Sequence, residues 1–427
     1  MGRRTKIRSF GAAALALLSA GGCYWTVPGQ GANRQAHNTA EDLLDVDNVV
    51  GIVQLWSAPT DEGPVGAPVT SAAGVHVNDA HGVYGFNPDT GARLWRHPVT
   101  APLVAQQPWV QDSTVLAGQW NPVATASAAN EGLDVTLALD AATGAAQATS
   151  PQANGSVIGL RGQRELQWNQ TYFPTRPATF WAQRLRVTDA STGTVVCCDG
   201  PFRLSSATAP AGPEPITLGS GWIFHAGQGV IDPGTAAVGN GVRGVSIANP
   251  ALCLGLYTCP TWLVTTDGTT ATAPVLSDDQ SVVYSGTDAG TMYAVQVTGD
   301  TASVLWSTPV GSAVTASPAL ADGRLFVPTA SGQLVALDAA TGAELWRGNV
   351  VSSIDVQPAV ANGVVHAGTA GGFLVAFDAS PCGATTCNPL QVRDVGSAIT
   401  GAPAVSGGHV YVGTDDGHVV AYGLPAG

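Results

Sequence analysis

The stretch GQLVALDAATGAELWRGNV, residues 332–350, predicts two short strands joined by a tight turn. In the turn, the Asp338 carboxylate can accept hydrogen bonds from backbone amides ahead of it, and Gly342 can adopt the positive φ that closes the turn. Trp346 follows, and its large flat side chain can pack one sheet onto the next. The stretch therefore favours a β-hairpin that is built to stack on a neighbour.

Near-copies of this hairpin recur at 82–95, 134–147, 183–196 and 290–306. A second pattern of two apolar runs, divided by Asp-Gly, Asn-Gly, Gly-Gly or a similar pair, precedes the hairpin at 68–82, 215–229, 318–332, 358–372 and 403–417. Such pairs form two-residue hairpin turns, so one full unit has four strands. With 53 Gly, 28 Pro and 11% charged residues, the composition also favours an all-β fold.

A single four-stranded sheet cannot bury both of its faces, whereas sheets stacked in a ring can. The pattern Ala336, Asp338, Gly342 and Trp346 resembles the PQQ-like (quinoprotein-like) β-propeller repeat, and the resemblance covers about residues 47–424. That family includes the BamB-like envelope lipoproteins and, more distantly, quinoprotein alcohol dehydrogenases. The resemblance implies a single β-propeller of four-stranded blades.

The repeat tryptophans set the blade count. They are Trp56, Trp95, Trp262, Trp306 and Trp346, with adjacent spacings of 39, 44 and 40 residues and one long interval of 167. The long interval contains two further turns, at 140–144 and 189–193, and is divided into three larger blades. The segment 48–56 has no blade of its own, and 417–424 lacks a last strand, so the two ends are expected to pair. We predict eight blades, with seven as the alternative, closed between the N- and C-terminal strands.

The first 22 residues have the features of a secretory signal. Four basic residues precede the apolar run 10–18, and small residues lead to Cys23. The stretch 18–23 resembles the lipobox of bacterial lipoproteins, which implies that Cys23 carries lipid; an ordinary signal peptide with an incidental cysteine is the alternative. We expect a signal peptide at 1–22, a flexible lipid-anchored tether at 23–46, and the propeller at 47–427.

The charge balance argues against polyanionic partners. The chain has 17 basic and 30 acidic residues, and removal of 1–22 takes away four basic residues, leaving 13 against 30 and a net charge near −17. Such a surface repels phosphate backbones and anionic lipid. We expect no nucleic-acid partner and expect membrane contact to come from the lipid at Cys23.

Six cysteines remain besides Cys23, an even number that suits an oxidising compartment. Fifteen pairings are possible, but Cys253 and Cys259, like Cys382 and Cys387, flank the same expanded turn of the repeat, so each pair is expected to close its own loop. Cys197 and Cys198 are adjacent and are expected to form a vicinal disulfide. Quinoprotein alcohol dehydrogenases have such a pair beside their quinone, and the resemblance therefore leaves a redox role as an alternative.

No catalytic constellation or metal site emerges from the remaining motifs. The stretch GNGVRG at 239–244 matches a dinucleotide-binding pattern, but it lies within a β unit and not between a strand and a helix. The acidic pairs at 278–279 and 415–416 lack the alternating oxygens of a calcium loop. We expect no cofactor, with pyrroloquinoline quinone and calcium only under the enzyme alternative.

These observations predict a non-catalytic, extracytoplasmic scaffold, anchored to the bacterial cell membrane or to an outer membrane, that binds an envelope protein or peptide segment as a monomer. The alternatives are a quinoprotein oxidoreductase and a small-ligand sensor. The three irregular units are the candidate partner surface, and their aromatic residues are Trp109, Trp120, Tyr172, Phe173 and Trp181. Alternatively, these side chains only fill the blade cores.

Overall fold

The computed structural model describes residues 24–26, 29–31, 33–99, 108–119, 135–147, 156–161, 164–173, 180–189, 195–205, 216–231, 238–246, 261–270, 272–350 and 352–425. Only the backbone is described at 118–119, 135–136, 227–231, 238–239 and in the strands between 156 and 205. The described residues form eight β-sheets and a short 3₁₀ helix, η1 (Val49–Gly51). None of the helical segments in these ranges has the length and apolar character of a membrane-spanning helix.

Five sheets contain four strands each and one contains three. Their orders are β2 (Val53–Pro59), β33 (His418–Gly423), β32 (His409–Thr414), β31 (Ile399–Ser406); β3 (Val69–Ser71), β4 (Gly74–Asn78), β5 (Gly82–Phe86), β6 (Arg93–Pro98); β7 (Trp109–Gln111), β8 (Thr114–Gln119), β9 (Val135–Asp140); β10 (Ser156–Arg161), β11 (Arg164–Phe173), β12 (Phe180–Asp189), β13 (Val195–Ser205); β14 (Ile216–Leu218), β15 (Trp222–Ile231), β16 (Val238–Ser246), β17 (Thr261–Thr265); and β18 (Val275–Leu276), β19 (Val282–Gly286), β20 (Thr291–Thr298), β21 (Thr301–Pro309).

Two sheets gain a fifth strand from elsewhere in the chain. Their orders are β22 (Ala319–Ala321), β23 (Arg324–Pro328), β24 (Gln333–Asp338), β25 (Glu344–Asn349), β29 (Thr386–Cys387); and β1 (His37–Asn38), β26 (Ala359–Ala361), β27 (Val364–Gly368), β28 (Phe373–Asp378), β30 (Gln391–Asp394). The added strands β29 and β1 both pair in parallel, at the outer and inner edge of their sheets respectively.

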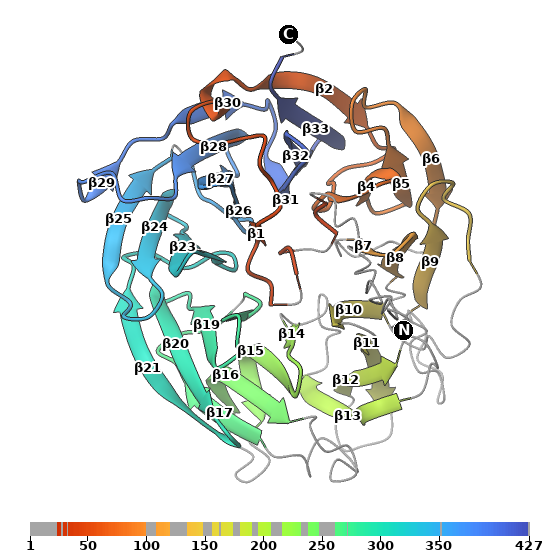
Figure 1. Ribbon diagram of the computed structural model, residues 1–427. Helices are drawn as coiled ribbons and strands as arrows, with labels where there is room; N and C mark the ends of the chain where they lie inside the picture. The colour runs from red at the N-terminus through yellow and green to blue at the C-terminus, as the bar shows by residue number, and fades with distance from the viewer. Residues whose placement is uncertain are drawn as a thin grey trace, which may run out of the picture.

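Figure 1 shows the sheets side by side around a common centre, with the inner strands β14, β26 and β31 nearer to it and β2, β6, β21 and β25 at the outside. β2 pairs with β33, placing Val53 opposite Gly423 and Pro59 opposite His418, so one sheet contains strands from both ends of the described chain. The sequence predicted this pairing.

The burial patterns explain why these segments are strands. In β24, all four residues from Leu334 to Leu337 are buried, because both faces of the sheet are covered by its neighbours. In the outer strand β25 burial alternates from Leu345 to Gly348, with Trp346 and Gly348 buried and Leu345 and Arg347 partly exposed. The core therefore lies between successive sheets.

The hairpin turn forms as the sequence predicts. Asp338 Oδ1 accepts hydrogen bonds from the backbone N–H of Thr341 at 2.8 Å and from its hydroxyl at 2.7 Å, and Gly342 has a φ of +73°. These bonds lower the pKa of the Asp338 carboxyl below its usual range. The Asp140 and Asn87 turns repeat the geometry.

Candidate functional site

The described residues between 24 and 38 (24–26, 29–31 and 33–38) lie across the inner side of the sheets, and we call them the axial segment (Figure 1). The carbonyl oxygens of five of its residues accept hydrogen bonds from the inner strands of five sheets. The pairs are Thr70 N–H to Trp25, Val110 N–H to Thr26, Leu276 N–H to Asn33, Leu320 N–H to Gln35, and Val360 N–H to Ala36, with N···O distances from 2.7 to 3.0 Å. Asn38 Nδ2 also donates to the Val405 carbonyl of β31 at 2.8 Å. The segment thus bonds to the innermost strands of six sheets.

The repeat explains these contacts. Each donor among the five inner strands lies two residues after a proline: Thr70 after Pro68, Val110 after Pro108, Leu276 after Pro274, Leu320 after Pro318 and Val360 after Pro358. Each of these five strands is the innermost strand of its own repeat, so the N–H of this residue points away from the second strand of the repeat and needs an acceptor. The axial segment supplies that acceptor at the same position of each repeat.

The predicted flexible tether at 23–46 is therefore wrong for the described residues of that range. Trp25, Ala36 and Leu44 are buried, and Glu41 accepts the backbone N–H of Gly408. The polar, Gly-containing composition of this stretch is typical of an exposed linker, yet the stretch packs against the inner strands. Its backbone carbonyls instead accept hydrogen bonds from the N–H groups of the inner strands. Cys23 and the signal peptide lie outside the described residues.

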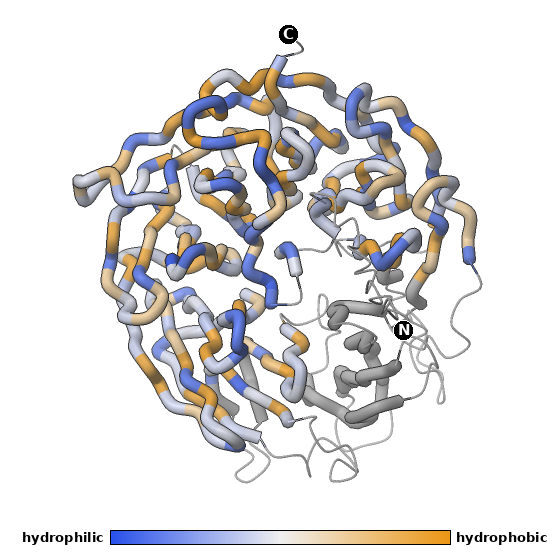
Figure 2. Tube along the Cα trace, viewed as in Figure 1, coloured by the Kyte–Doolittle hydropathy of each residue, from blue (hydrophilic) through white to orange (hydrophobic). Residues whose placement is uncertain are grey.

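The axial segment places polar side chains at the centre of the molecule, as the hydrophilic trace around β1 in Figure 2 shows. Gln357 Nε2 donates to the carbonyls of Arg34 and Pro318, both at 2.9 Å, and Gln35 Nε2 donates to Asp278 Oδ1 at 2.8 Å. Burial lowers the pKa of the Arg34 guanidinium to about 10.

Trp109, predicted to belong to an exposed partner surface, lies in this central region. Its side chain is 5% exposed, and the Arg34 guanidinium carbon lies 5.7 Å from its ring centroid. The correction has a physical cause, because β7 is an inner strand and the axial segment covers it. Tyr172, Phe173 and Trp181 lie on β11 and β12, where only the backbone is described, and Trp120 lies outside the described residues.

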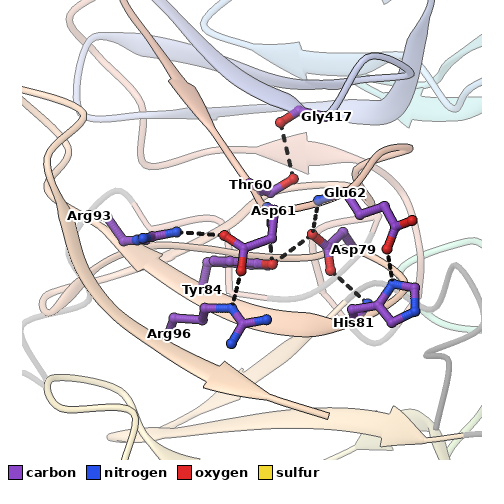
Figure 3. Close-up of polar contacts among 9 residues, drawn as sticks. All are labelled: Thr60, Asp61, Glu62, Asp79, His81, Tyr84, Arg93, Arg96 and Gly417. Carbon is purple, nitrogen blue, oxygen red and sulfur yellow. Dashed lines mark hydrogen bonds and ion pairs between the residues drawn. The ribbon is translucent and has the colours of Figure 1, made fainter. Parts of the chain in front are cut away.

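A second polar cluster lies away from the axial segment. It surrounds the connection between the outer strand β2 and the inner strand β3 (Figure 3). Asp61 forms ion pairs with Arg93 Nη1 at 2.8 Å and with Arg96 Nε at 2.5 Å. Tyr84 Oη donates to Asp79 Oδ2 at 2.7 Å and accepts the Asp61 N–H at 3.2 Å. We call these five residues, together with Glu62 and His81, the rim network.

Backbone and surface groups complete the rim network. The backbone N–H groups of Glu62 and His81 donate to the two oxygens of Asp79 at 3.0 and 2.8 Å, while the side chains of the same two residues pair at 2.5 Å. Asp79 is 2% exposed, whereas the Glu62 and His81 side chains are 62% and 51% exposed. Burial, followed by the bond to Asp79, raises the pKa of Tyr84 to about 12. The rim network therefore combines a buried Tyr84–Asp79 hydrogen bond with charged side chains that are exposed to solvent.

A related arrangement occurs four sheets further along. The Asp267 N–H donates to Tyr293 Oη at 3.2 Å, and its carboxylate accepts the hydroxyls of Thr287 and Thr291. Asp61 and Asp267 both follow a threonine at the end of an outer strand. This Thr-Asp repeat would have revealed the network in the sequence. The rim network differs from this arrangement in that Arg93 and Arg96 of β6 add two positive charges, which pair with Asp61.

Trp56, Trp95, Trp306 and Trp346 lie against the following sheet, the position that the sequence predicts for the repeat tryptophans. Trp56, Trp95 and Trp306 donate through Nε1 to the carbonyls of Pro88, Ala141 and Ala339, each in the turn of the following sheet. Trp346 packs on Phe377 of the next sheet with 5.8 Å between ring centroids, and Trp262 on Phe224 of its own sheet at 6.1 Å.

Cys382 and Cys387 form the predicted disulfide. It closes the loop that carries β29, which adds to the outer edge of β25 in the preceding sheet. Cys253 and Cys259 lie outside the described residues. Cys197 and Cys198 lie on the outer strand β13, where only the backbone is described.

We tested whether the centre fits the pyrroloquinoline quinone and calcium of the enzyme alternative. The carbonyls of the axial segment already bond to the inner strands, so the segment occupies the space around the axis. Within the described ranges, His, Cys, Asp and Glu form no group of three or more that could hold a metal ion. The residues present there do not fit the cofactor while the segment is in place.

Comparison with known proteins agrees with the repeat architecture. A family model described as outer membrane protein assembly factor BamB matches residues 260–384. Solved structures with a similar fold include BamB from Moraxella catarrhalis, at 14% identity and a TM-score of 0.57, covering 88% of this chain and 98% of that one. Quinohemoprotein alcohol dehydrogenase from Comamonas testosteroni has 14% identity and a TM-score of 0.65, covering 94% and 80%.

A computationally designed protein, Ika8, is similar at 16% identity and a TM-score of 0.59, covering 87% of this chain and 99% of that one. No curated protein matches the sequence significantly. The chain has an all-β fold similar to that of BamB, and residues 260–384 match the BamB family model. Its structural relatives include both an assembly factor and dehydrogenases, so the fold leaves catalysis open.

Proposed function

We propose that this protein is a non-catalytic scaffold of the bacterial cell envelope, lipid-anchored through Cys23 on the extracytoplasmic side of the cell membrane or on an outer membrane. In this proposal the eight sheets are the blades of one ring, closed by β2 on β33. The molecule acts as a monomer and binds an envelope protein or a peptide segment.

The observation that carries the proposal is the position of the axial segment. A quinoprotein or a sugar sensor needs an open centre for its ligand. Here five carbonyls of residues 25–36 accept hydrogen bonds around the centre, where such a ligand would bind. Removing them would leave buried donors without partners, which is costly. This arrangement favours a rigid binding platform over a catalytic funnel.

The exposed, charged side chains of the rim network are available for contact with a partner. Arg93, Asp61, Glu62 and His81 are each at least 40% exposed and are held in place by the buried Tyr84–Asp79 pair. Preorganised charges of both signs suit recognition of a folded protein surface. The match of residues 260–384 to the BamB model supports a role in envelope protein assembly.

The test is a titration of the chain that begins at Tyr24, with its disulfides intact, with pyrroloquinoline quinone and calcium. Tryptophan fluorescence reports binding, and dye reduction with alcohols and sugars reports turnover. A quinoprotein alcohol dehydrogenase measured in parallel is the positive control. We expect neither saturable binding nor turnover, and tight binding with turnover would overturn the scaffold proposal in favour of a quinoprotein oxidoreductase.

The partner is then sought by cross-linking the lipidated protein in its own envelope. A photo-reactive residue at Arg93 should capture a defined envelope protein, and the same residue at Val304 on the outer strand β21 serves as the matched exposed control. Capture of the same set of proteins from both positions would argue against a partner surface at the rim network.

A further inference from the structure

The start of the described chain lies on the inner side of the sheets, against the inner strand β3. Trp25 is 3% exposed, its N–H donates to Thr70 Oγ1 at 2.6 Å, and its carbonyl accepts the Thr70 N–H at 2.7 Å. Cys23 precedes Trp25 by two residues, so the chain between them spans at most about 7 Å. Any group attached to Cys23 is therefore confined near the inner strand β3.

The height of this attachment point within the ring is also defined. Every sheet has two ends, and we call the end with the turns between first and second strands the turn face. The turn face carries the turns at residues 72–73, 112–113, 322–323, 362–363 and 407–408. The opposite end, the loop face, carries the turns between second and third strands at 79–81, 287–290, 329–332, 369–372 and 415–417. The rim network belongs to the loop face.

Trp25 lies close to the turn face. Its partner Thr70 is the middle residue of the three-residue strand β3, and only Ser71 separates it from the turn at 72–73. Thr70 Oγ1 also donates to Ser406 Oγ, and Ser406 ends β31 at the turn 407–408. The chain emerges on this same face further on, where Glu41 binds the Gly408 N–H and Leu43 lies beside Gly408.

We propose that the lipidated protein has no slack tether and lies with its turn face flat against the lipid bilayer. This inference rests on the proposed lipidation of Cys23. The acyl chains on Cys23 enter the bilayer from a point that lies at most about 7 Å along the chain from Trp25. The axial segment cannot lengthen this connection without breaking its bonds to six sheets. Because the anchor leaves from the inner side of the sheets and not from their outer edge, the turn face lies against the bilayer, and the loop face with its rim network points away from the membrane.

Charge does not produce this orientation. The turn face carries Asp112, Asp278, Asp279 and Asp322, which would be repelled by anionic lipid. The anchor holds these carboxylates near the head groups by covalent geometry. Zwitterionic vesicles are therefore the suitable probe, since they test the anchor without the repulsion.

The test uses the lipidated protein in phosphatidylcholine vesicles that contain nitroxide-labelled head groups, which quench a fluorophore only at short range. A small fluorophore is introduced through a non-natural amino acid at Asn362 on the turn face or at Ala370 on the loop face, at the two ends of the same strand β27. We expect several-fold stronger quenching at Asn362. The matched control inserts about ten Gly and Ser residues between Cys23 and Tyr24, a flexible linker that should abolish the difference.

Equal quenching at both positions in the lipidated protein, or stronger quenching at Ala370, would overturn the orientation while leaving the anchor intact. Mass spectrometry of the same sample decides the anchor separately. Absence of acyl mass on Cys23 would overturn the anchor in the proposed function, and this inference with it. A difference in quenching that persists with the long linker would show that the face itself binds lipid, which would also contradict control by the anchor.

Discussion

The indole Nε1 of Trp306 donates a hydrogen bond of 3.0 Å to the carbonyl oxygen of Ala339, in the turn of the next sheet. Trp56 and Trp95 form the same bond with the turns that follow them, at 2.8 and 2.9 Å. Each of these turns ends in a glycine on which the indole lies. In these three repeats, the tryptophan thus joins successive sheets both by packing and by a hydrogen bond.

Replacing Gly342 by alanine should disrupt this joint. A Cβ at Gly342 would lie 2.6 Å from the Trp306 ring, and its φ of +73° is unfavourable for alanine. We expect the free energy of unfolding to fall by about 1–3 kcal/mol or more, as overpacking typically does. Gly299→Ala is the control, because its φ is also positive but nothing lies within 4 Å of the added Cβ. Equal shifts of the urea midpoint for both variants would contradict the packing argument.

The disulfide should act as a local latch on the neighbouring sheet. β29 adds to the outer edge of β25, where the Arg347 N–H donates to the Thr385 carbonyl at 2.9 Å. In Cys382→Ser/Cys387→Ser the loop loses its constraint, which for so short a loop contributes about 2 kcal/mol at most. We expect faster hydrogen exchange at the Arg347 amide, with the Ser307 amide on β21 unchanged. Unaltered exchange at Arg347 would show that the loop holds its place without the bond.

The repeat made most of the fold predictable from the sequence. The Asp338–Gly342 turn, the spacing of the tryptophans and the pairing of 48–56 with the last strands follow from short-range chemistry repeated along the chain. Regular repeats are predictable because each unit contacts mainly its neighbours.

The axial segment could not be predicted in the same way. Its acceptors are backbone carbonyls, which every sequence has, and its partners lie 45 to 324 residues away. The composition of 24–46 resembles a linker because the segment packs through its backbone and amide side chains and buries few apolar residues. The rim network was missed for a different reason, since Asp61 and Tyr84 are brought together only when two sheets stack.

Within the rim network, the buried and exposed parts should differ in their contribution to stability. Tyr84→Phe removes a donor to the buried Asp79 and the acceptor of the Asp61 N–H, and should cost about 1–3 kcal/mol. Asp61→Asn removes ion pairs whose side chains are 31–47% exposed, and should cost less than about 1 kcal/mol. Denaturant midpoints decide the order, and a larger loss for Asp61→Asn would mean that the ion pairs dominate.

Buried histidines should make the fold sensitive to acid. His366 is fully buried, and burial lowers its pKa from 6.5 to about 4. Between these values the unfolded chain binds more protons than the folded one, so stability is fully present above about pH 6.5 and is lost as the pH falls toward 4. Phe326 occupies the corresponding position in the preceding sheet, each opposite an alanine of the inner strand. His366→Phe should therefore flatten the fall of the unfolding midpoint between about pH 6.5 and 4, and an unchanged slope would exclude His366 as its source.

The axial segment should behave as a detachable ligand of the ring. A chain that begins at Thr39 loses the acceptors for five inner-strand N–H groups, and each unsatisfied buried donor costs about 1–3 kcal/mol. Its thermal midpoint should fall by well over about 5 °C relative to the chain that begins at Tyr24. A synthetic peptide of residues 24–38 should restore the midpoint in a saturable manner, because the inner strands present their donors at fixed positions. A peptide of scrambled sequence should restore less, since Trp25 and Ala36 would no longer meet their buried sites. If both chains unfold at the same temperature, the segment is a tether after all, and its hydrogen bonds contribute nothing to the fold.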